Sequence, residues 1–190
     1  GNATYSVVPD QIEAGTFMLA AMATKGDILI KNCITKHLEP LTAKIIEMGG
    51  HVEDNGDSIR VRCTKRPNKA NIKTLPYPGF PTDLQPQMGV VLSIANGTSI
   101  INESIWDSRF QYTAELNKMG AKITAQGKSA IFEGVETLYG APVYATASGY
   151  VEYAGWYYGY GKYIRLNHDY GYKTAYAHMN GYRKDLKVGS

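Results

Sequence analysis

Two kinds of hydrophobic pattern alternate in the first part of the chain. Apolar side chains repeat at helical spacing over residues 12–24 and again over 41–48, whereas residues 28–33 form a short, mostly apolar run typical of a strand. Gly26 follows the first helical pattern and predicts its end, because glycine readily takes the left-handed conformation found after helices. Pro40 precedes the second pattern and fits the first turn of a helix. The pattern therefore predicts a helix, a strand and a second helix.

A predicted hairpin completes this set of elements. Residues 51–63 alternate between apolar and polar positions around Asn55-Gly56, a pair that favours a type I′ turn. Similar sequences return 71 residues later without a gap and align three sets of positions: Gly26 with Gly97, Met48-Gly49 with Met119-Gly120, and Gly56 with Gly127. The second copy predicts four elements in turn: a helix over about 84–96, a strand over 98–103, a helix over 110–119 and a hairpin turning at Gln126-Gly127. We therefore expect two copies of one helix–strand–helix–hairpin unit, over about residues 12–63 and 83–134.

The chain changes character near residue 144. Only three of the 15 tyrosines precede residue 136, and the others are mixed with glycine. Large and polar residues alternate with period 2 in three runs: YVEYAGW (150–156), KYIRLNH (162–168) and YKTAYAH (172–178). This pattern predicts antiparallel β structure. The overall expectation is an α+β fold, with helices inside and sheets outside in the two copies and a Tyr/Gly-rich antiparallel tail after them.

Composition and charge exclude several classes of function. The net charge is only +3 and the basic residues form no stripe, so we expect no nucleic-acid partner. No apolar run reaches the length of a membrane span and no signal segment begins the chain, which predicts no membrane partner. Cys33 and Cys63 lie far apart in strand-like runs without a C-x-x-C pattern. We expect two buried, reduced thiols.

Residues 5–143 resemble one enzyme family. The similarity rests on VVPDQIEAGTFMLAAMATKGDILIKN, YPGFPTDLQPQ, Ser108-Arg109-Phe110 and ELNKMGAKI. These segments look like the UDP-N-acetylglucosamine 1-carboxyvinyltransferases of the enolpyruvyltransferase family. The resemblance implies part of an inside-out α/β domain, with two repeated units and the start of a third. It also implies a cytoplasmic protein without a cofactor, related to the transfer of enolpyruvate from phosphoenolpyruvate to UDP-N-acetylglucosamine in peptidoglycan synthesis.

Three residues in the matching motifs are candidates for the site. Taken alone, Thr82 or Asp83 is interpreted as the cap of the helix that follows, satisfying its free amides. The resemblance implies that Asp83 is a catalytic carboxylate, which binds a sugar hydroxyl and helps to remove its proton, and that Thr82 contacts the substrate. Taken alone, Arg109 is interpreted as half of a surface salt bridge, and the resemblance places it near the nucleotide substrate.

Other expected features limit what this segment can do. Lys65-Arg66 is expected on a solvated face, and Glu103 is expected to be a charge at a strand end. Neither Cys33 nor Cys63 has the Pro-Gly-Gly-Cys neighbours of the family's loop cysteine. The resemblance also places the residues that hold phosphoenolpyruvate outside the matching segment. Because the reaction needs such groups to stabilise developing negative charge, we expect no complete transfer.

The tail resembles a second family, the M23 (LytM-like) zinc endopeptidases that cut peptidoglycan cross-bridges. The similarity rests on APVYATASGYVEYAGW, YGKYIRLNHDYGYKTAYAHM and LKVGS. It implies that His178 is a catalytic histidine beside a metal-bound water and that His168 is its structural neighbour. The family's H-x-x-x-D and H-x-H ligand motifs are missing from this sequence, so we expect no metal site, and zinc only if the peptidase interpretation holds. Taken alone, His178 is a strand histidine close to Tyr176.

Three hypotheses stay open for a chain divided into residues 4–143 and 144–190. It is a transferase fragment, a zinc endopeptidase fragment acting on peptidoglycan, or a non-enzymatic fold made by recombination or design. The third explains the missing residues of both families by one event, and the stretch G-A-P-V-x-A-T (140–146) is common to both patterns. In that case we expect the tail to cover an apolar face of the first segment. Limited proteolysis that released two separately stable pieces would contradict this.

Overall fold

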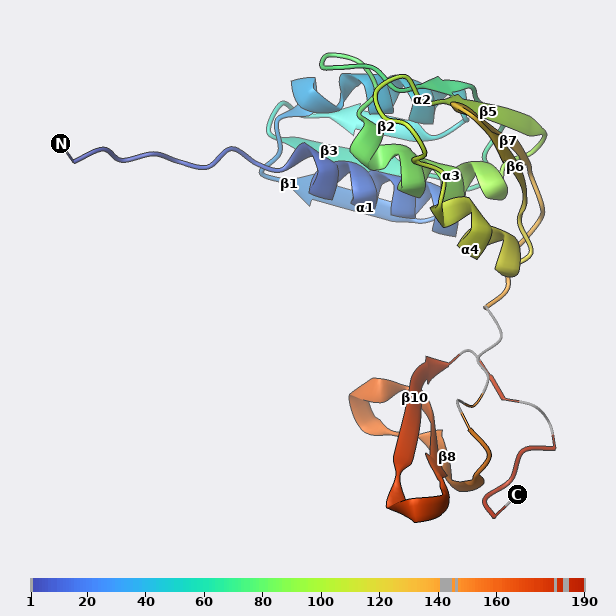
Figure 1. Cartoon of the computed structure of the whole chain (residues 1–190). Helices are drawn as coiled ribbons and strands as arrows, with labels where there is room; N and C mark the ends of the chain where they lie inside the picture. Colours follow the sequence, from blue (N-terminus) through green and yellow to red (C-terminus); the bar gives the residue numbers. More distant parts are fainter. Residues whose placement is uncertain (1, 141–144, 146, 180, 183–184, 190) are drawn as a thin grey trace. The chain divides into compact units, whose positions relative to one another are not determined.

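The structure divides into two compact units, Gly1–Tyr139 and Gly140–Ser190. It is a computed structural model that describes residues 2–140, 145, 147–179, 181–182 and 185–189, without the side chains of Tyr170 and His178. The larger unit has a mixed α/β architecture, and the smaller unit is built on one antiparallel sheet (Figure 1). In the described part of the chain, no helix has the length and apolar character needed to cross a bilayer.

The first sheet of the larger unit has strand order β1-β3-β2 and is antiparallel throughout. Its elements follow in chain order: α1 (Gln11–Thr24), β1 (Asp27–Lys31), η1 (Thr35–Leu38), α2 (Glu39–Glu47), β2 (His51–Asp54) and β3 (Ser58–Arg62). Asp10 caps α1 by accepting hydrogen bonds from the amides of Ile12 and Glu13. Pro40 lies in the first turn of α2, as its position in the sequence predicts.

The second sheet has the order β4-β5-β7-β6. Its elements also follow in chain order: β4 (Ile72–Lys73), η2 (Thr82–Leu84), α3 (Gln85–Ser93), β5 (Thr98–Asn102), α4 (Tyr112–Lys118), β6 (Lys122–Gln126) and β7 (Ser129–Glu133). Strand β4 pairs parallel with β5, and the other pairs are antiparallel. Strands β5, β6 and β7 begin 71 residues after β1, β2 and β3, and they pair in the same order.

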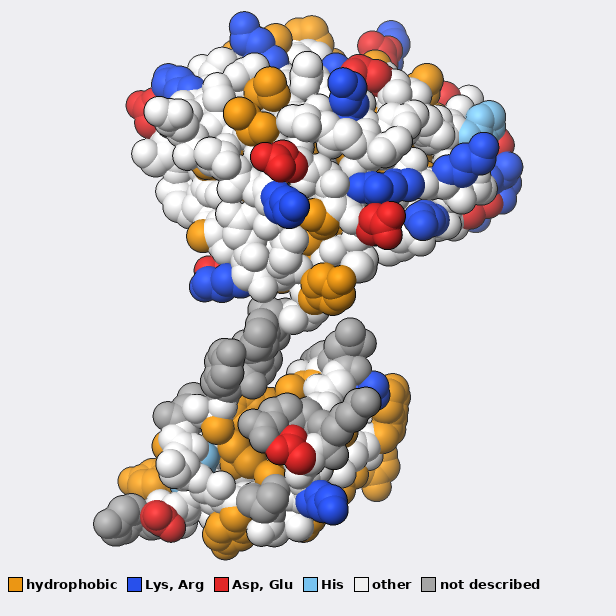
Figure 2. Space-filling model, turned by 90° about the vertical axis from the view of Figure 1, so that its right-hand side faces the viewer, with side chains coloured by type: hydrophobic (Ala, Val, Ile, Leu, Met, Phe, Trp, Pro, Cys, Tyr) orange, Lys and Arg blue, Asp and Glu red, His pale blue; other side chains and the backbone are white. Residues whose placement is uncertain are grey.

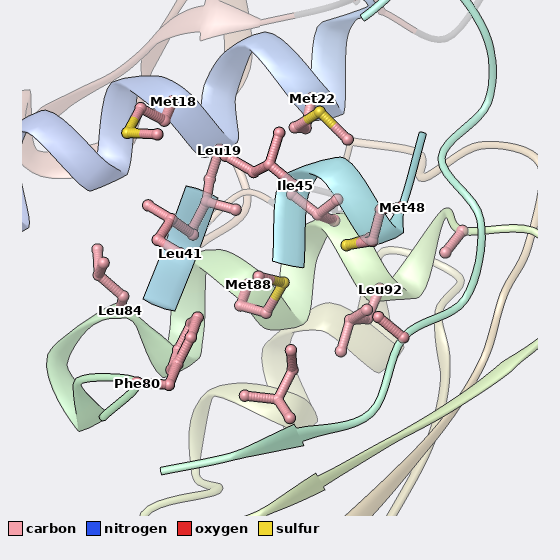
Figure 3. Packing of buried hydrophobic residues seen from close by; sticks show 14 of the residues in the cluster. Met18, Leu19, Met22, Leu41, Ile45, Met48, Phe80, Leu84, Met88 and Leu92 are labelled. Carbon is pink, nitrogen blue, oxygen red and sulfur yellow. The ribbon is translucent and has the colours of Figure 1, made fainter. Parts of the chain in front are cut away.

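The core of the larger unit lies mainly around its helices. Helix α1 packs against α3, β1 and β3, and α3 packs in turn against β5, β7 and α4. Figure 3 shows Met18 and Met22 of α1, Ile45 of α2 and Met88 of α3 pointing into one apolar cluster, in which all four side chains are buried. Gly15 allows α1 to lie close to Leu84 of η2, because a Cβ atom at Gly15 would be only 2.5 Å from Leu84 Cδ1.

Helix α1 ends where Gly26 predicts, because Lys25 is its C-cap residue and Gly26 follows it, donating its amide to the carbonyl of Ala21. The left-handed conformation, at φ 54°, is taken by Lys25 and not by Gly26. The predicted type of the first hairpin turn is wrong. The hairpin between β2 and β3 has Gly56 at φ 87°, and Asn55 has no positive φ. A single positive φ at the first central residue is the pattern of a type II′ turn, not of type I′. Gly127, at φ 57°, holds the same position between β6 and β7.

The expectation that Arg66 lies on a solvated face is also wrong. Its guanidinium donates hydrogen bonds to the carbonyl oxygens of Ile94 and Ala95 after α3, and to those of Gly134 and Val135 after β7. The side chain is half-buried. Arg66 therefore donates to carbonyl groups of two chain segments, and these carbonyls lack partners within a helix or sheet. The planar guanidinium, with five donors, suits this role better than a lysine would.

The smaller unit contains β8 (Tyr150–Trp156), β9 (Lys162–Asn167) and β10 (Lys173–Met179) in the order β10-β9-β8. These strands occupy the three alternating runs of the tail. A small core is formed by Val151, Ile164 and Leu166. Several tyrosine rings of this unit contact one another, and Tyr157 stacks on Tyr163 with a centroid distance of 5.0 Å.

His168 is buried within this smaller unit. Its Nδ1 lies 2.9 Å from the carbonyl oxygen of Ser148, and its Nε2 lies 2.7 Å from Thr174 Oγ1. Because a carbonyl oxygen can only accept, Nδ1 must carry a proton, and a neutral ring then accepts from Thr174 through Nε2. Both ring nitrogens are thus used to hold the residue that follows β9 to Ser148, before β8, and to Thr174 in β10.

Candidate functional site

Asp83 and Arg109 lie far apart in the sequence and form an ion pair in the structure. Arg109 Nη2 lies 2.6 Å from Asp83 Oδ1. Asp83 lies in η2, at the start of the α3 region, and Arg109 lies in the loop between β5 and α4. The Asp83 side chain is 60% exposed and that of Arg109 is 31% exposed. A carboxylate oriented by a guanidinium at an accessible surface can accept a hydrogen bond from a ligand hydroxyl.

The helix-capping interpretation of Thr82 and Asp83 is wrong. Neither η2 nor α3 has a side-chain hydrogen bond at its N-cap, and the N-cap residues are Pro81 and Leu84. The Thr82 hydroxyl instead donates to Glu103 Oε2 at 2.7 Å. The structure therefore brings Asp83 and Arg109 together directly and gives Thr82 a partner beneath them.

Glu103 is the residue of this region that sequence reasoning missed. It directly follows β5, as the expected charge at a strand end, but the sequence did not predict that the residue would be only 2% exposed. Oε1 accepts from Thr74 Oγ1 and from the amides of Ile105 and Trp106, whereas Oε2 accepts from Thr82 Oγ1 and Gln85 Nε2. Because these donors come from segments up to 29 residues away, no local pattern could identify this buried carboxylate.

Burial and hydrogen bonding act in opposite directions on Glu103. Burial in the protein disfavours the charged carboxylate, but the hydroxyls of Thr82 and Thr74 and the amides of Ile105 and Trp106 outweigh it. The net result is a pKa of Glu103 below its ordinary value. The carboxylate is therefore ionised at neutral pH and acts as an acceptor for all of its neighbours.

A hollow of about 430 Å³ adjoins Arg109. It is lined by Pro86, Trp106, Asp107, Ser108, Arg109, Gln111 and Tyr112. The hydroxyl of Tyr112 is buried and has no hydrogen-bond partner within the described residues, and burial together with the charge of Glu103 raises its pKa. Ser108 has a φ of 56°, in the left-handed region that non-glycine residues seldom adopt. The loop carrying Arg109 is thus held in an uncommon conformation.

Many charged side chains on the larger unit are paired with one another. Figure 2 shows Lys and Arg interspersed with Asp and Glu on one face of this unit. In the first sheet, Asp27 accepts hydrogen bonds from Arg60 and Arg62, and the bond from Arg60 contributes most to lowering the pKa of Asp27. These guanidinium groups are therefore engaged within the protein surface.

The cysteines and histidines were also candidates for chemistry. Cys33 and Cys63 are free and buried, as expected, and burial raises the pKa of the Cys33 thiol. The side chain of His178 lies outside the described part of the structure, which therefore leaves its proposed role untested. Among the described side chains, no group of three His, Cys, Asp or Glu residues is placed to hold a metal ion.

Comparison with known proteins places this site in a family. The model of EPSP synthase (3-phosphoshikimate 1-carboxyvinyltransferase) matches residues 1–148. The chain belongs to this enolpyruvyltransferase family. It is 58% identical over 143 residues to a Clostridium botulinum protein named UDP-N-acetylglucosamine 1-carboxyvinyltransferase, covering 75% of this chain and 34% of that protein. A Caldanaerobacter subterraneus subsp. tengcongensis protein named UDP-N-acetylglucosamine 1-carboxyvinyltransferase 3 is 55% identical over 142 residues, again covering 75% and 34%.

Solved structures support the same fold for this enolpyruvyltransferase segment. The enolpyruvyl transferase NikO from Streptomyces tendae aligns with a TM-score of 0.62 at 22% identity, covering 68% of this chain and 31% of that one. EPSP synthase from Acinetobacter baumannii aligns with a TM-score of 0.52 at 22% identity, covering 65% and 31%. The chain thus spans about a third of the length of each of these four relatives.

A second family model, Peptidase family M23, matches residues 133–190. The two matched ranges overlap over residues 133–148, which include the boundary between the two compact units. The enolpyruvyltransferase match covers most of the chain, and the M23 match covers the smaller unit.

Proposed function

We propose that residues 1–148 form the acceptor-side portion of an enolpyruvyl transfer site for UDP-N-acetylglucosamine. The observation that carries this proposal is the ion pair of Asp83 with Arg109 beside an open hollow, in a segment with more than half of its residues identical to those of proteins named for this substrate. The same identification makes a cytoplasmic location and a place in peptidoglycan synthesis part of the proposal.

The proposed chemistry assigns separate roles to the three candidate residues. Asp83 accepts a hydrogen bond from the sugar 3-hydroxyl and helps to remove its proton, as the hydroxyl oxygen becomes bonded to C2 of phosphoenolpyruvate in place of the phosphate, which leaves. Arg109 orients the Asp83 carboxylate through Oδ1 and faces the nucleotide. Thr82 lies next to Asp83 in the same motif and completes the surface against which the sugar binds. The two strand–helix sets that begin 71 residues apart are interpreted as copies of one unit.

These 190 residues alone are proposed to bind the acceptor without completing the transfer. The two cysteines, Cys33 and Cys63, are buried, and Asp83 by itself adds negative charge where the reaction needs cationic or hydrogen-bonding groups. Phosphate release from phosphoenolpyruvate in the presence of UDP-N-acetylglucosamine would contradict this part of the proposal.

Binding of UDP-N-acetylglucosamine tests the role of Asp83. The protein should bind this nucleotide sugar saturably in calorimetry, and Asp83→Ala should weaken the affinity at least about tenfold, because a charged hydrogen-bond acceptor is lost. The control is Glu115→Ala, which removes another exposed carboxylate that is paired with a lysine, at 2.7 Å. Equal affinities of Asp83→Ala and the unsubstituted protein would refute the assignment.

The M23 match favours a second candidate function, that of a zinc endopeptidase fragment acting on peptidoglycan. In this alternative His178 is the catalytic histidine, and the protein binds zinc. We expect the purified protein to contain far less than one zinc per chain by elemental analysis, because the family's ligand motifs are missing from the sequence. One tightly bound zinc per chain would favour the peptidase instead.

The joining of the two matched families is itself part of the proposal. We propose that a recombination or design event fused the transferase-like and peptidase-like segments near residues 140–148, where the family matches overlap. The coding sequence on both sides of this segment tests the idea. If that coding sequence continued as an enolpyruvyltransferase through the junction, without the peptidase-like segment, the idea would be refuted.

A further inference from the structure

Glu103 connects the two segments that carry the ion pair. Its Oε2 holds Thr82, the residue directly before Asp83, and Gln85, the first residue of α3. Its Oε1 holds the amides of Ile105 and Trp106, in the loop that leads to Arg109. One buried carboxylate thus bonds to the chain on both sides of the surface where Asp83 and Arg109 meet.

The ion pair is too exposed to set its own geometry. Contacts between exposed charged side chains contribute little free energy, because water and salt screen them and long side chains lose entropy on pairing. The hydrogen bonds beneath are different, since they involve a charged acceptor that is 2% exposed and lie in a region of low dielectric. The positions of Asp83 and Arg109 must therefore depend on the anchored backbone below them.

The backbone conformation next to Arg109 supports the same conclusion. Ser108 holds a left-handed conformation at φ 56°, and such strain persists only when the surroundings determine it. The amide bonds from Ile105 and Trp106 to Glu103 fix the loop just before this residue. Glu103 thus constrains the loop from which the Arg109 guanidinium reaches Asp83.

Only a carboxylate can satisfy all of these neighbours together. The five groups around Glu103 are hydroxyl, amide and backbone N–H donors, and an ionised carboxylate accepts at both oxygens. A glutamine would place its NH2 group against either Thr82 and Gln85 or the other three donors. The negative charge at this position is therefore needed for the arrangement.

We propose that Glu103 is a positioning residue that holds Asp83 and Arg109 in register for the acceptor substrate. This inference rests on the proposed function for the identity of its ligand. The effect of Glu103 on the Asp83–Arg109 contact does not depend on any ligand. Glu103 itself is buried and acts through Thr82, Gln85 and the loop before Arg109.

The test uses two substitutions that each remove one donor from Oε2. Thr82→Val and Gln85→Met keep the side-chain volume and lose the hydrogen bond to Glu103. Gln85 is fully buried and cannot touch a ligand, so any loss of affinity in Gln85→Met acts through Glu103. The control is Thr35→Val, which removes a hydroxyl from a buried threonine that bonds to the carbonyl of Gly56, in the other sheet.

Three measurements separate positioning from stability. Crystal structures without ligand should show the Asp83–Arg109 contact of 2.6 Å lost or lengthened in Thr82→Val and Gln85→Met and kept in Thr35→Val. Calorimetry should show affinity for UDP-N-acetylglucosamine reduced about tenfold in the first two and unchanged in the control. Thermal unfolding should show comparable losses for all three variants, and Thr82→Ser should restore both the contact and the affinity.

The outcomes distinguish this inference from the proposed function. If the unsubstituted protein does not bind the nucleotide sugar, the proposed function fails, and the crystal structures alone then decide the positioning role. An unchanged Asp83–Arg109 contact in both Oε2 variants would overturn the inference. Equal loss of affinity in the Thr35→Val control would also overturn it, since the effect would then follow stability alone.

Discussion

Replacing Glu103 by alanine is expected to destabilise the larger unit by about 3 kcal/mol, because several buried donors lose their acceptor. The groups left unpaired are the hydroxyls of Thr74 and Thr82, the Gln85 amide and the backbone amides of Ile105 and Trp106. For a unit of this size the midpoint of thermal unfolding should fall by about 10 °C. Urea unfolding followed by circular dichroism measures the free energy directly.

The pH dependence of this loss has a definite sign. The pKa of Glu103 is lowered from its ordinary value of 4.5, so the folded state binds its proton less readily than the unfolded state. Its contribution is therefore complete above about pH 4.5 and disappears as the pH falls through the lowered value. The difference in free energy between the unsubstituted protein and Glu103→Ala should shrink in acid. Asp27, whose pKa is also lowered, is present in both proteins. Its pH-dependent contribution to stability therefore cancels when the two are compared.

An exposed carboxylate provides the control for Glu103. Glu115 pairs with Lys118 on α4 and its side chain is 69% exposed. Glu115→Ala should change the free energy of unfolding by no more than about 0.5 kcal/mol. A Glu103→Ala variant as stable as Glu115→Ala would show that water replaces the lost acceptor without cost.

Replacing Gly134 by alanine is expected to cost about 3 kcal/mol or more, because the added methyl group meets backbone atoms that cannot rotate away. A Cβ atom at this position would overlap the carbonyl oxygen of Ala95. That oxygen and the carbonyl of Gly134 both accept from Arg66, so moving them apart also breaks this contact. Denaturant unfolding and the yield of soluble protein should both fall.

Gly127 separates the steric cost at Gly134 from the conformational cost of losing a glycine. It has a positive φ of 57°, but a Cβ atom there would meet nothing within 4 Å. Gly127→Ala should therefore lose only about 1 kcal/mol, from left-handed backbone strain. If Gly134→Ala lowered the free energy of unfolding no more than Gly127→Ala, the close approach of Gly134 to Ala95 would not exist in solution.

Local signals predicted most of the elements in the larger unit. Pro40 marked the start of α2, and the strands expected over 28–33 and 98–103 appear as β1 and β5 with slightly shifted ends. The position of the turn at Gly56 was predicted correctly, but its turn type was wrong. The sequence does not show which residue of Asn55-Gly56-Asp57 takes the positive φ. Such details depend on how the strands pair, which local propensity does not specify.

The candidate site was only partly predictable. Motif similarity selected Asp83, Thr82 and Arg109, but it did not show that Asp83 and Arg109 touch or that the Thr82 hydroxyl donates to Glu103. Arg66 was expected on a solvated face and Glu103 only as a charge at a strand end, and charged residues are rarely buried. Each is an exception because it meets a set of partners from other segments.

The sequence by itself determined the local elements and the membership of the enolpyruvyltransferase family, because helical spacing, turn glycines and motif identity are properties of neighbouring residues. The tertiary structure alone decided which charges are buried and what they hold. The partners of Arg66 lie 28 to 69 residues away and those of Glu103 up to 29. Hydrogen bonds over such separations form only when the sheets and helices have packed, so no local pattern of polar and apolar residues records them.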